Sequence, residues 1–524
     1  MSSPLVTPPG VVLSPENVAL VACFSVTDLS VLHRIVNRSY TTQTWRKHPS
    51  KLISMTAKGA GGTGKTTAAW NASAELLMDG KEDQVLVTNL DSQPSLEERL
   101  LGKVIHNVFN DDFNSLLALN NLTGSTILSG LNSCLAGPEF RLEPPKLLTV
   151  DPVRLAGLRP ATRAGPTRPT AGPFFDPGDS GKRIHIMLSD ENISEWDHQL
   201  STSSVLRNIG AAGSIHKAVP GALYSLLQMT AYVLGVTYIV MDMGPGNGGL
   251  NRIAIMCSDA WFMPLCIDNK CASTIASFAS SLPTWATNYV QTVWQTAGTD
   301  NKYPLPVVHV ADAAPTTAAP EAPAAAAASL GIGLHLLPSI MAPPPPPTPR
   351  LPKFLGVVFS RLGVRGAVRP YNQYAALLRS QQLITQALIP SVVACNMALP
   401  MPAYQQCLQP ILNTFAQMPA GAQAAPNPVP GVCNILREFD SLQYMSERES
   451  VPVPFLQQHH FLSPGGDEYG QFLEALAANP NLPYPPDDAF LALPTTASAV
   501  ILSAKVANIR GMTRIFLRMI TDNL

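Results

Sequence analysis

The chain has 524 residues, including 49 prolines, and its 35 lysines and arginines nearly balance its 36 acidic residues, for a formal net charge of −1. This charge excludes attraction of the whole molecule to nucleic acid, so any such contact requires a local basic patch. The eight cysteines include no C-x-x-C pair and indicate neither a zinc site nor a disulfide framework, and no run approaches the ~18 apolar residues that span a membrane.

The first 50 residues are expected to form an N-terminal extension. Their beginning, MSSPLVTPPG, lacks the basic start of a secretory signal and interrupts its apolar region with proline. Arg34, Arg38 and Arg46 leave an organelle transit peptide open, while Glu16 and Asp28 argue against one. Otherwise we expect a cytoplasmic protein with reduced thiols.

A phosphate-binding loop is predicted in the sequence KGAGGTGKTT, residues 58–67, which follows an apolar run at 52–55 and precedes an alanine-rich helical pattern. It matches G-x-x-x-x-G-K-[ST], in which glycines let backbone N–H groups face phosphate oxygens, the lysine reaches the β and γ phosphates, and the hydroxyl binds magnesium. The expected binding residues are Gly59, Gly61, Gly62, Thr63, Gly64, Lys65, Thr66 and Thr67.

Two acidic residues follow apolar runs that predict buried strands. Asp91 comes after VLVTNL, and Asp242 comes after YIVM. Each could face a ligand at the carboxyl end of a parallel strand. Two structural alternatives stay open at this stage: Asp91 as the cap of the following helix, and Asp242 as a turn residue.

Two proline-rich stretches predict insertions. Residues 311–350 hold 10 prolines and 12 alanines, and such a composition has little branched or aromatic surface to bury. Residues 143–183 are also interrupted by prolines, and four arginines make them basic: Arg154, Arg159, Arg163 and Arg168. Both a solvated loop and a nucleic-acid arm are open for the basic insertion.

The last 22 residues predict a basic amphipathic helix. Arg510, Arg514 and Arg518 are spaced to form one stripe of it. Three roles are open for this stripe: the solvated face of a packing helix, a contact to DNA phosphates, and a membrane-surface anchor, of which the membrane anchor is the least favoured.

Four segments resemble, in the same order, the motifs of the ParA/MinD (Soj-like) family of P-loop ATPases with a deviant Walker A loop. They are residues 58–67, 84–95, 237–268 and 353–374. The resemblance implies that Lys65 neutralises the β and γ phosphates of ATP, that Thr66 and Asp242 hold Mg²⁺, and that Asp91 orients the attacking water.

The sequence departs from the family pattern at two positions. The family's signature lysine, which reaches across a dimer, lies five residues before the loop lysine, where this chain has Ala60. Lys58 lies seven residues before Lys65, so the same catalytic role for Lys58 requires the loop to bulge by two residues. The first acid of the family's D-x-D pair is replaced by Asn89.

The resemblance implies an ATP hydrolase that uses ATP-driven homodimerisation as a switch for partitioning or positioning DNA or another large cargo. Hydrolysis is expected to be slow until a partner protein or dimerisation completes the site. Two alternatives stay open: a nucleotide-binding interaction protein with little or no hydrolysis, and a MinD-like membrane-surface ATPase.

The expected fold is α/β, a doubly wound and mostly parallel sheet with helices on both faces. Its P-loop NTPase domain would span residues 51–524, interrupted by disordered Pro/Ala-rich insertions at about 143–183 and 311–350. Short apolar runs predict the strands at residues 52–55, 85–90, 183–188, 238–241, 261–267, 354–359 and 451–456.

Overall fold

The computed structural model describes residues 2–29, 45, 49–56, 64–78, 82–132, 142–160, 174–175, 180–206, 213–245, 248–266, 269–291, 303, 305–306, 349–362, 376, 379–399, 433–437, 446 and 450–452. Within these residues, ten strands form one sheet. In order across the sheet they are β1 (Ser2–Pro4), β2 (Phe24–Thr27), β5 (Leu147–Val150), β8 (Arg183–Met187), β4 (Gln84–Leu90), β9 (Tyr238–Met243), β3 (Lys51–Met55), β10 (Ala260–Cys266), β11 (Lys353–Leu362) and β12 (Cys433–Arg437).

The sheet is mostly parallel, as the sequence predicts. From β8 to β12 every neighbouring pair of strands is parallel, whereas β5, β2 and β1 continue the sheet antiparallel. The chain moves from β3 past β9 to β4, and later from β9 past β3 to β10. Because such crossovers are right-handed, movement in opposite directions places the connecting helices on opposite faces. The fold is therefore a doubly wound α/β sheet.

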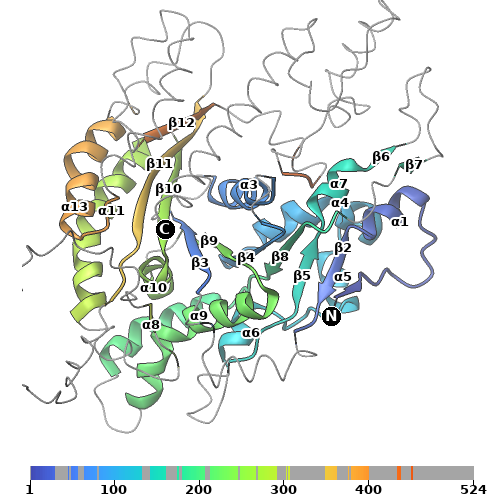
Figure 1. Ribbon diagram of the computed structural model, residues 1–524, viewed down its shortest axis with the longest axis horizontal. Coiled ribbons are helices and arrows are strands. Elements are labelled where there is room, and N and C mark those ends of the chain that lie inside the picture. The colour runs from blue at the N-terminus through green and yellow to red at the C-terminus, as the bar shows by residue number, and fades with distance from the viewer. Residues whose placement is uncertain are drawn as a thin grey trace, which may run out of the picture.

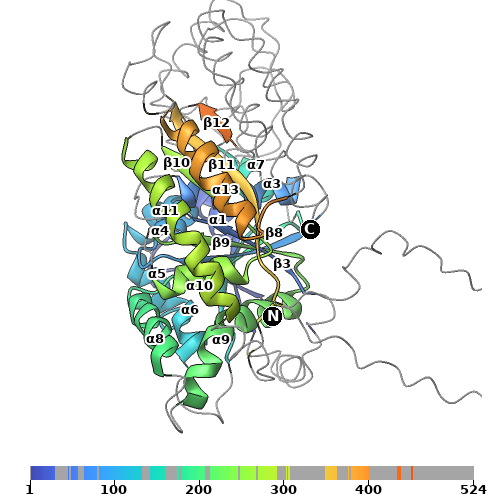
Figure 2. The same ribbon diagram turned by 90° about the vertical axis from the view of Figure 1, so that its left-hand side faces the viewer.

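The helices cover both faces of this sheet. Figure 1 shows α3 on one side of β9 and α9 and α10 on the other, and Figure 2 shows α11 beside α13. The described helices are α1 (Pro15–Val21), α3 (Lys65–Met78), α4 (Ser95–Phe109), α5 (Phe113–Leu119), α6 (Ile127–Asn132), α7 (Pro152–Gly157), α8 (Ile193–Leu206), α9 (Gly213–Leu234), α10 (Gly249–Cys257), α11 (Asn269–Asn288), the π-helix η7 (Ile384–Leu388) and α13 (Ile389–Ala394).

Continuous apolar runs explain the central strands. Every residue of β9 and β10 is buried, as expected where helices cover both faces of a parallel sheet. Trp261 of β10 packs against Phe354 of β11 and Phe278 of α11 with tilted rings, whose centroids lie 4.4 and 5.1 Å from that of Trp261. These aromatic contacts attach α11 to the sheet.

The N-terminal extension contributes directly to the sheet. β2 pairs with β5, and β1 pairs with β2 at the edge. A chain of hydrogen bonds crosses these strands: Gln84 to His185 at 2.8 Å, His185 to Thr149 at 2.9 Å, Thr149 to Thr27 at 2.7 Å and Thr27 to Ser2 at 2.9 Å. Residues 2–29 are thus built into the domain that was expected to begin at residue 51.

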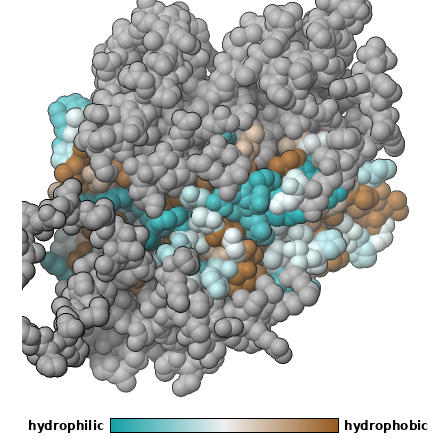
Figure 3. Space-filling view, viewed as in Figure 1, coloured by the Kyte–Doolittle hydropathy of each residue, from teal (hydrophilic) through white to brown (hydrophobic). Residues whose placement is uncertain are grey.

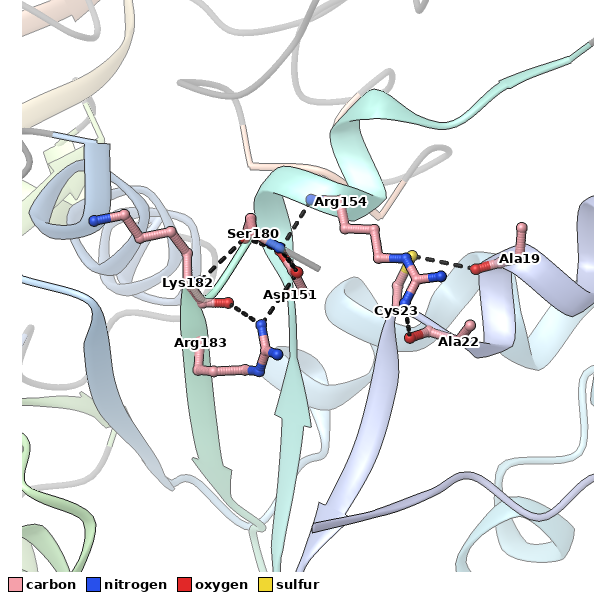
Figure 4. A network of polar contacts seen from close by, with 8 residues as sticks. All are labelled: Ala19, Ala22, Cys23, Asp151, Arg154, Ser180, Lys182 and Arg183. Atoms are coloured by element: carbon pink, nitrogen blue, oxygen red, sulfur yellow. Dashed lines mark hydrogen bonds and ion pairs between the residues drawn. The ribbon is translucent and has the colours of Figure 1, made fainter. Parts of the chain in front are cut away.

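The expected basic insertion, residues 143–183, is partly folded. It contains β5 and α7, and a separate pair of short strands, β6 (Arg159–Pro160) and β7 (Phe174–Phe175). Asp151 caps α7 through the Arg154 N–H and also accepts hydrogen bonds from Ser180 and Arg183 (Figure 4). The buried Asp151 carboxylate therefore holds Ser180 close to the start of α7. Residues 161–173 and 176–179 lie outside the described residues.

A second buried aspartate marks the end of the other expected insertion. Asp259, just before β10, accepts the Leu52 N–H at 2.7 Å and pairs with Arg350 at 2.7 Å. The Arg350 N–H also donates to the Pro306 carbonyl. Residues 307–348 lie outside the described residues.

One predicted strand is wrong in its described part. Residues 451–452, the start of the expected strand at 451–456, are not in a strand, and β12 (Cys433–Arg437) pairs with β11 instead. Both prolines of VPVPFL lack the N–H that a sheet ladder needs.

No helix in the described part of the chain is long and apolar enough to cross a membrane. On the side shown in Figure 3, a band of hydrophilic residues crosses the described surface between patches of hydrophobic residues.

Candidate functional site

The candidate site lies at the carboxyl ends of the central parallel strands. β3 leads towards α3, Asp91 directly follows β4, and Asp242 lies near the end of β9. The register places Met55 of β3 and Asn89 of β4 on either side of Asp242. Three segments that are far apart in the sequence therefore meet at one edge of the sheet, where ligands of doubly wound folds bind.

The first turn of α3 carries the described part of the predicted phosphate-binding loop. Gly64 has a φ of +84°, which a side chain would disfavour, and its carbonyl accepts the Ala68 N–H at 2.8 Å. Lys65 and Thr67 are buried, and Thr66 is partly exposed. Gly64 thus turns the chain into a helix whose first N–H groups face the site.

The electrostatics of the site centre on Lys65 and Asp242. Burial lowers the pKa of Lys65, although the carboxylates of Asp242 and Asp91 raise it. Burial also raises the pKa of Asp242 to about 7, and the Thr66 hydroxyl and Lys65 oppose this increase. The protein therefore holds a lysine and a carboxylate close together in an environment that disfavours both charges.

The Asp242 carboxylate fits a magnesium site. Both of its oxygens are buried and have no hydrogen-bond partner of normal geometry within the described residues, although the Thr66 hydroxyl is close enough to affect its pKa. Mg²⁺ is typically held by one or two carboxylates together with waters and substrate phosphates. The described residues contain no group of three or more His, Cys, Asp or Glu side chains that could hold a metal by itself. Asp242 and Thr66 are thus suited to a magnesium ion that accompanies a phosphate ligand.

Asp91 lies in a tight turn beside Asp242. Its N–H donates to Asn89 Oδ1 at 2.9 Å, and its Oδ1 accepts the Gln93 N–H at 3.3 Å. A Cβ atom on Gly244, just after β9, would lie 3.7 Å from the Asp91 carboxyl carbon. The N-cap of α4 is Pro94, without a side-chain cap. Asp91 therefore does not cap this helix, and its partly exposed carboxylate lies beside the Asp242 loop.

Two contacts from α4 reach the first turn of α3. The Ser95 and Thr66 hydroxyls are 3.3 Å apart, and Arg99 donates to the Thr67 hydroxyl. Glu97, on the same helix, is buried between β4 and β8. No motif in the sequence marks these α4 residues, because their partners lie in other segments of the chain.

Side chains hold the described residues that follow Asp242 on either side of residues 246–247. Asp197 of α8 accepts the Leu250 N–H at 2.8 Å at the start of α10, and any side chain at Gly248 would collide with the Asp197 carboxylate. Asn251 donates to the Gly244 carbonyl at 3.0 Å. Leu250 and Asn251 lie in residues 237–268, one of the four segments that resemble the family motifs, but nothing in that segment indicates Asp197.

Several predicted site residues lie outside the described residues. They are Lys58, Gly59, Gly61, Gly62, Thr63, Arg510, Arg514 and Arg518. The described residues bring together Gly64, Lys65, Thr66, Asp91 and Asp242.

Comparison with known proteins gives matches among solved structures. No family model matches the sequence, and no curated protein matches it. The pNOB8 ParA structure is 11% identical, with a TM-score of 0.39 and coverage of 90% of this chain and 99% of that chain. Apo McdA from Cyanothece is 13% identical, with a TM-score of 0.32 and coverage of 64% and 82%. Cobyrinic acid a,c-diamide synthase from Mycobacterium smegmatis, with bound ADP and magnesium, is 12% identical, with a TM-score of 0.29 and coverage of 63% and 80%.

Proposed function

We propose that this chain is a ParA-like ATPase that binds ATP and Mg²⁺ at the carboxyl ends of β3, β4 and β9 and hydrolyses ATP slowly. The observation that carries the proposal is the buried Asp242 carboxylate, which has no hydrogen-bond partner of normal geometry within the described residues and lies near Lys65 and Thr66. A carboxylate in this position needs a cation to offset its burial.

Each described site residue has a role in this proposal. Lys65 contacts the β and γ phosphates, and the N–H groups of the first turn of α3 donate to phosphate oxygens. Thr66 and Asp242 hold magnesium, which when bound would neutralise charge on the phosphates. Asp91 accepts a proton from the attacking water or orients it.

The biological part of the proposal is a nucleotide-dependent homodimer that positions DNA or another large cargo. Its support is the order of the four sequence motifs and the basic stripe of Arg510, Arg514 and Arg518. Lys58 would contribute across the dimer, and a partner protein would stimulate hydrolysis.

One experiment tests binding and turnover separately. Calorimetry with ATP is done with magnesium and again with EDTA, and phosphate release is measured with and without DNA. We expect magnesium-dependent binding and slow release that DNA or dimerisation changes. Absence of ATP binding contradicts the proposal, and binding without release favours the non-hydrolysing alternative.

The role of Asp91 predicts a separation of binding from hydrolysis. Asp91→Ala should bind ATP as the parent does yet lose phosphate release, and it should accumulate the ATP-bound form, which is dimeric if the dimer exists. Sedimentation with ATP measures this form. Asp83→Ala, at the other end of β4, is the matched control and should behave as the parent. Loss of folding in Asp91→Ala would show that Asp91 has a structural role.

A further inference from the structure

The turn that carries Asp91 is held by the side chain of Asn89. Asn89 is fully buried and uses both ends of its amide. Its Oδ1 accepts the Asp91 N–H at 2.9 Å, and its Nδ2 donates to the Gln93 carbonyl at 3.0 Å and to Glu97 Oε2 at 2.8 Å. Asn89 therefore fixes both ends of the turn, and Glu97 fixes Asn89.

Glu97 is a completely buried carboxylate that joins three elements. It lies in the first turns of α4, accepts the Asn89 amide from β4, and accepts the Ser189 N–H just after β8 at 2.6 Å. Burial raises the pKa of Glu97, while the bonds from Ser189 and Asn89 lower it. Both of its oxygens act as acceptors, which an amide in the same place could not achieve.

The identities of residues 89 and 97 are complementary. A carboxylate at position 89 would lie 2.8 Å from a Glu97 oxygen, and residue 89 is also the register partner of Asp242 on the neighbouring strand β9. Acids so close together repel unless they share a proton. The asparagine at position 89, where the resembled motif has an acid, thus supplies the N–H donor that Glu97 requires.

Helix α4, which carries Glu97, also contacts the first turn of α3. Ser95 and Arg99, on either side of Glu97, contact Thr66 and Thr67 at the start of α3. The Glu97 carboxylate also raises the pKa of Asp242, and α4 thus contacts both Asn89 in the Asp91 turn and the first turn of α3.

We propose that Glu97 is the positioning residue for Asp91. The family motif has an acid at position 89 of β4, and in this chain Glu97 of α4 supplies a carboxylate beside that position. By its hydrogen bond to Asn89, Glu97 determines the position of Asp91 relative to Lys65 and Thr66. This inference rests on the proposed function, because Asp91 is the water-orienting residue there. Glu97 acts only through Asn89 and the turn and touches no substrate.

A double-mutant cycle with exchanged side chains tests this role. Glu97→Gln leaves an amide that cannot accept from both Ser189 and Asn89, and Asn89→Asp brings two carboxylates together. The combined Asn89→Asp, Glu97→Gln variant can re-form three of the four hydrogen bonds, because the new amide at 97 can donate to the new carboxylate at 89. Glu98→Gln, an exposed neighbour on α4, is the matched control.

The measurements are the single-turnover rate of phosphate release, the affinity for ATP with magnesium, and the thermal midpoint of unfolding. Each single variant should lower the rate on the order of 10- to 100-fold, as loss of an outer-shell partner does, while ATP affinity changes less than about threefold. The combined variant should recover most of the rate, and Glu98→Gln should match the parent.

Two results would overturn the role of Glu97. One is a rate unchanged in Glu97→Gln. The other is a parallel loss of rate, ATP affinity and thermal midpoint, because a purely structural network loses all three together. A parent protein that binds ATP but never releases phosphate contradicts the proposed hydrolysis itself and therefore this role too, whereas a hydrolysing parent with an unaffected Glu97→Gln variant contradicts only this inference.

Discussion

Asp242 lowers the stability of the folded protein when no ligand is bound. Its carboxylate is fully buried, neither oxygen has a hydrogen-bond partner of normal geometry within the described residues, and burial raises its pKa to about 7. Such a group destabilises the fold when it is ionised, and a bound cation would offset that effect. Asp242 thus affects the stability of the protein without ligand, and in the proposed function it also affects ligand binding.

The first prediction concerns Asp242 and pH. Between its ordinary pKa of 3.8 and its folded pKa of about 7, the folded state binds more protons than the unfolded state, so stability falls as pH rises through this window. The difference between these two pKa values corresponds to a change of at most about 4 kcal/mol in the free energy of unfolding. In EDTA, Asp242→Asn should therefore unfold at a higher temperature than the parent at pH 8, and the difference should shrink at pH 5. An equal difference at both pH values would contradict the shifted pKa.

The second prediction concerns Lys65. Replacing Lys65 with alanine removes the cation proposed to contact the β and γ phosphates, and should weaken ATP binding by about 2 to 3 kcal/mol, as loss of a charge-assisted contact does. Calorimetry with ATP and magnesium measures the change. Lys182→Ala, at the start of β8, is the control and should bind ATP as the parent does. Unchanged affinity in Lys65→Ala would contradict the phosphate-loop assignment.

At the scale of the elements, β8 joins the parallel and antiparallel parts of the sheet. His185 of β8 is buried between Gln84 of β4 and Thr149 of β5. If its Nε2 donates to Gln84 Oε1, its Nδ1 must accept from the Thr149 hydroxyl, and the hydroxyls of Thr27 and Ser2 then donate in the same direction. The neutral form of one imidazole thus orients hydrogen bonds across five described strands.

The third prediction follows from this neutral histidine. Burial lowers the pKa of His185 to about 4, with a further contribution from Arg183. Its stabilising contribution is fully present above pH 6.5 and is lost as the pH falls towards 4, by about 3 kcal/mol. His185→Gln should therefore reduce the loss of stability between pH 6.5 and 4, measured by urea unfolding.

The exposed His106→Gln is the control for this measurement and should follow the parent. Asp242 acts in the opposite direction in the same pH window, so each residue is isolated only by comparing its variant with the parent. A His185→Gln variant with the same acid dependence as the parent would contradict the lowered pKa.

The fourth prediction concerns the basic stripe near the C-terminus. If Arg510, Arg514 and Arg518 contact DNA phosphates, replacing all three with alanine should weaken DNA binding and reduce the log–log salt slope by roughly 0.9 per lost contact, without changing ATP binding. A membrane role predicts loss of sedimentation with anionic vesicles instead. A triple variant that matches the parent in both assays would leave only a packing helix and remove the local support for DNA binding.

At the scale of the whole molecule, the sequence predicts the strands that are buried on both faces. The runs that became β3, β4, β8, β9, β10 and β11 are apolar, and helices cover them on both sides. The strands β1, β2, β5 and β12 were missed. β1, β2 and β12 hold at most two consecutive apolar residues and adjoin none of the four motif segments, and β5 lies in a stretch whose prolines and arginines predict a loop.

The candidate site likewise contains some residues that the sequence predicts and others that it does not. Lys65, Thr66, Asp91 and Asp242 were predicted because each belongs to a short motif at the end of a strand. Glu97 was not, because its contact with Ser189 joins residues 92 positions apart and exists only once β4 and β8 are paired. Asp197 is hidden for the same reason, since it lies 53 positions before Leu250.

The paired ends of the two expected insertions have a consequence for chain length. Asp151 holds Ser180 and Arg183, and the Arg350 N–H holds the Pro306 carbonyl while its guanidinium binds Asp259. Once the two ends of a segment are fixed, each doubling of its length costs only about 0.6 kcal/mol in closure entropy. Shorter or longer segments between these anchors should therefore change the stability of the sheet little. The lengths of the two segments can thus differ among related chains while the sheet and its helices stay the same.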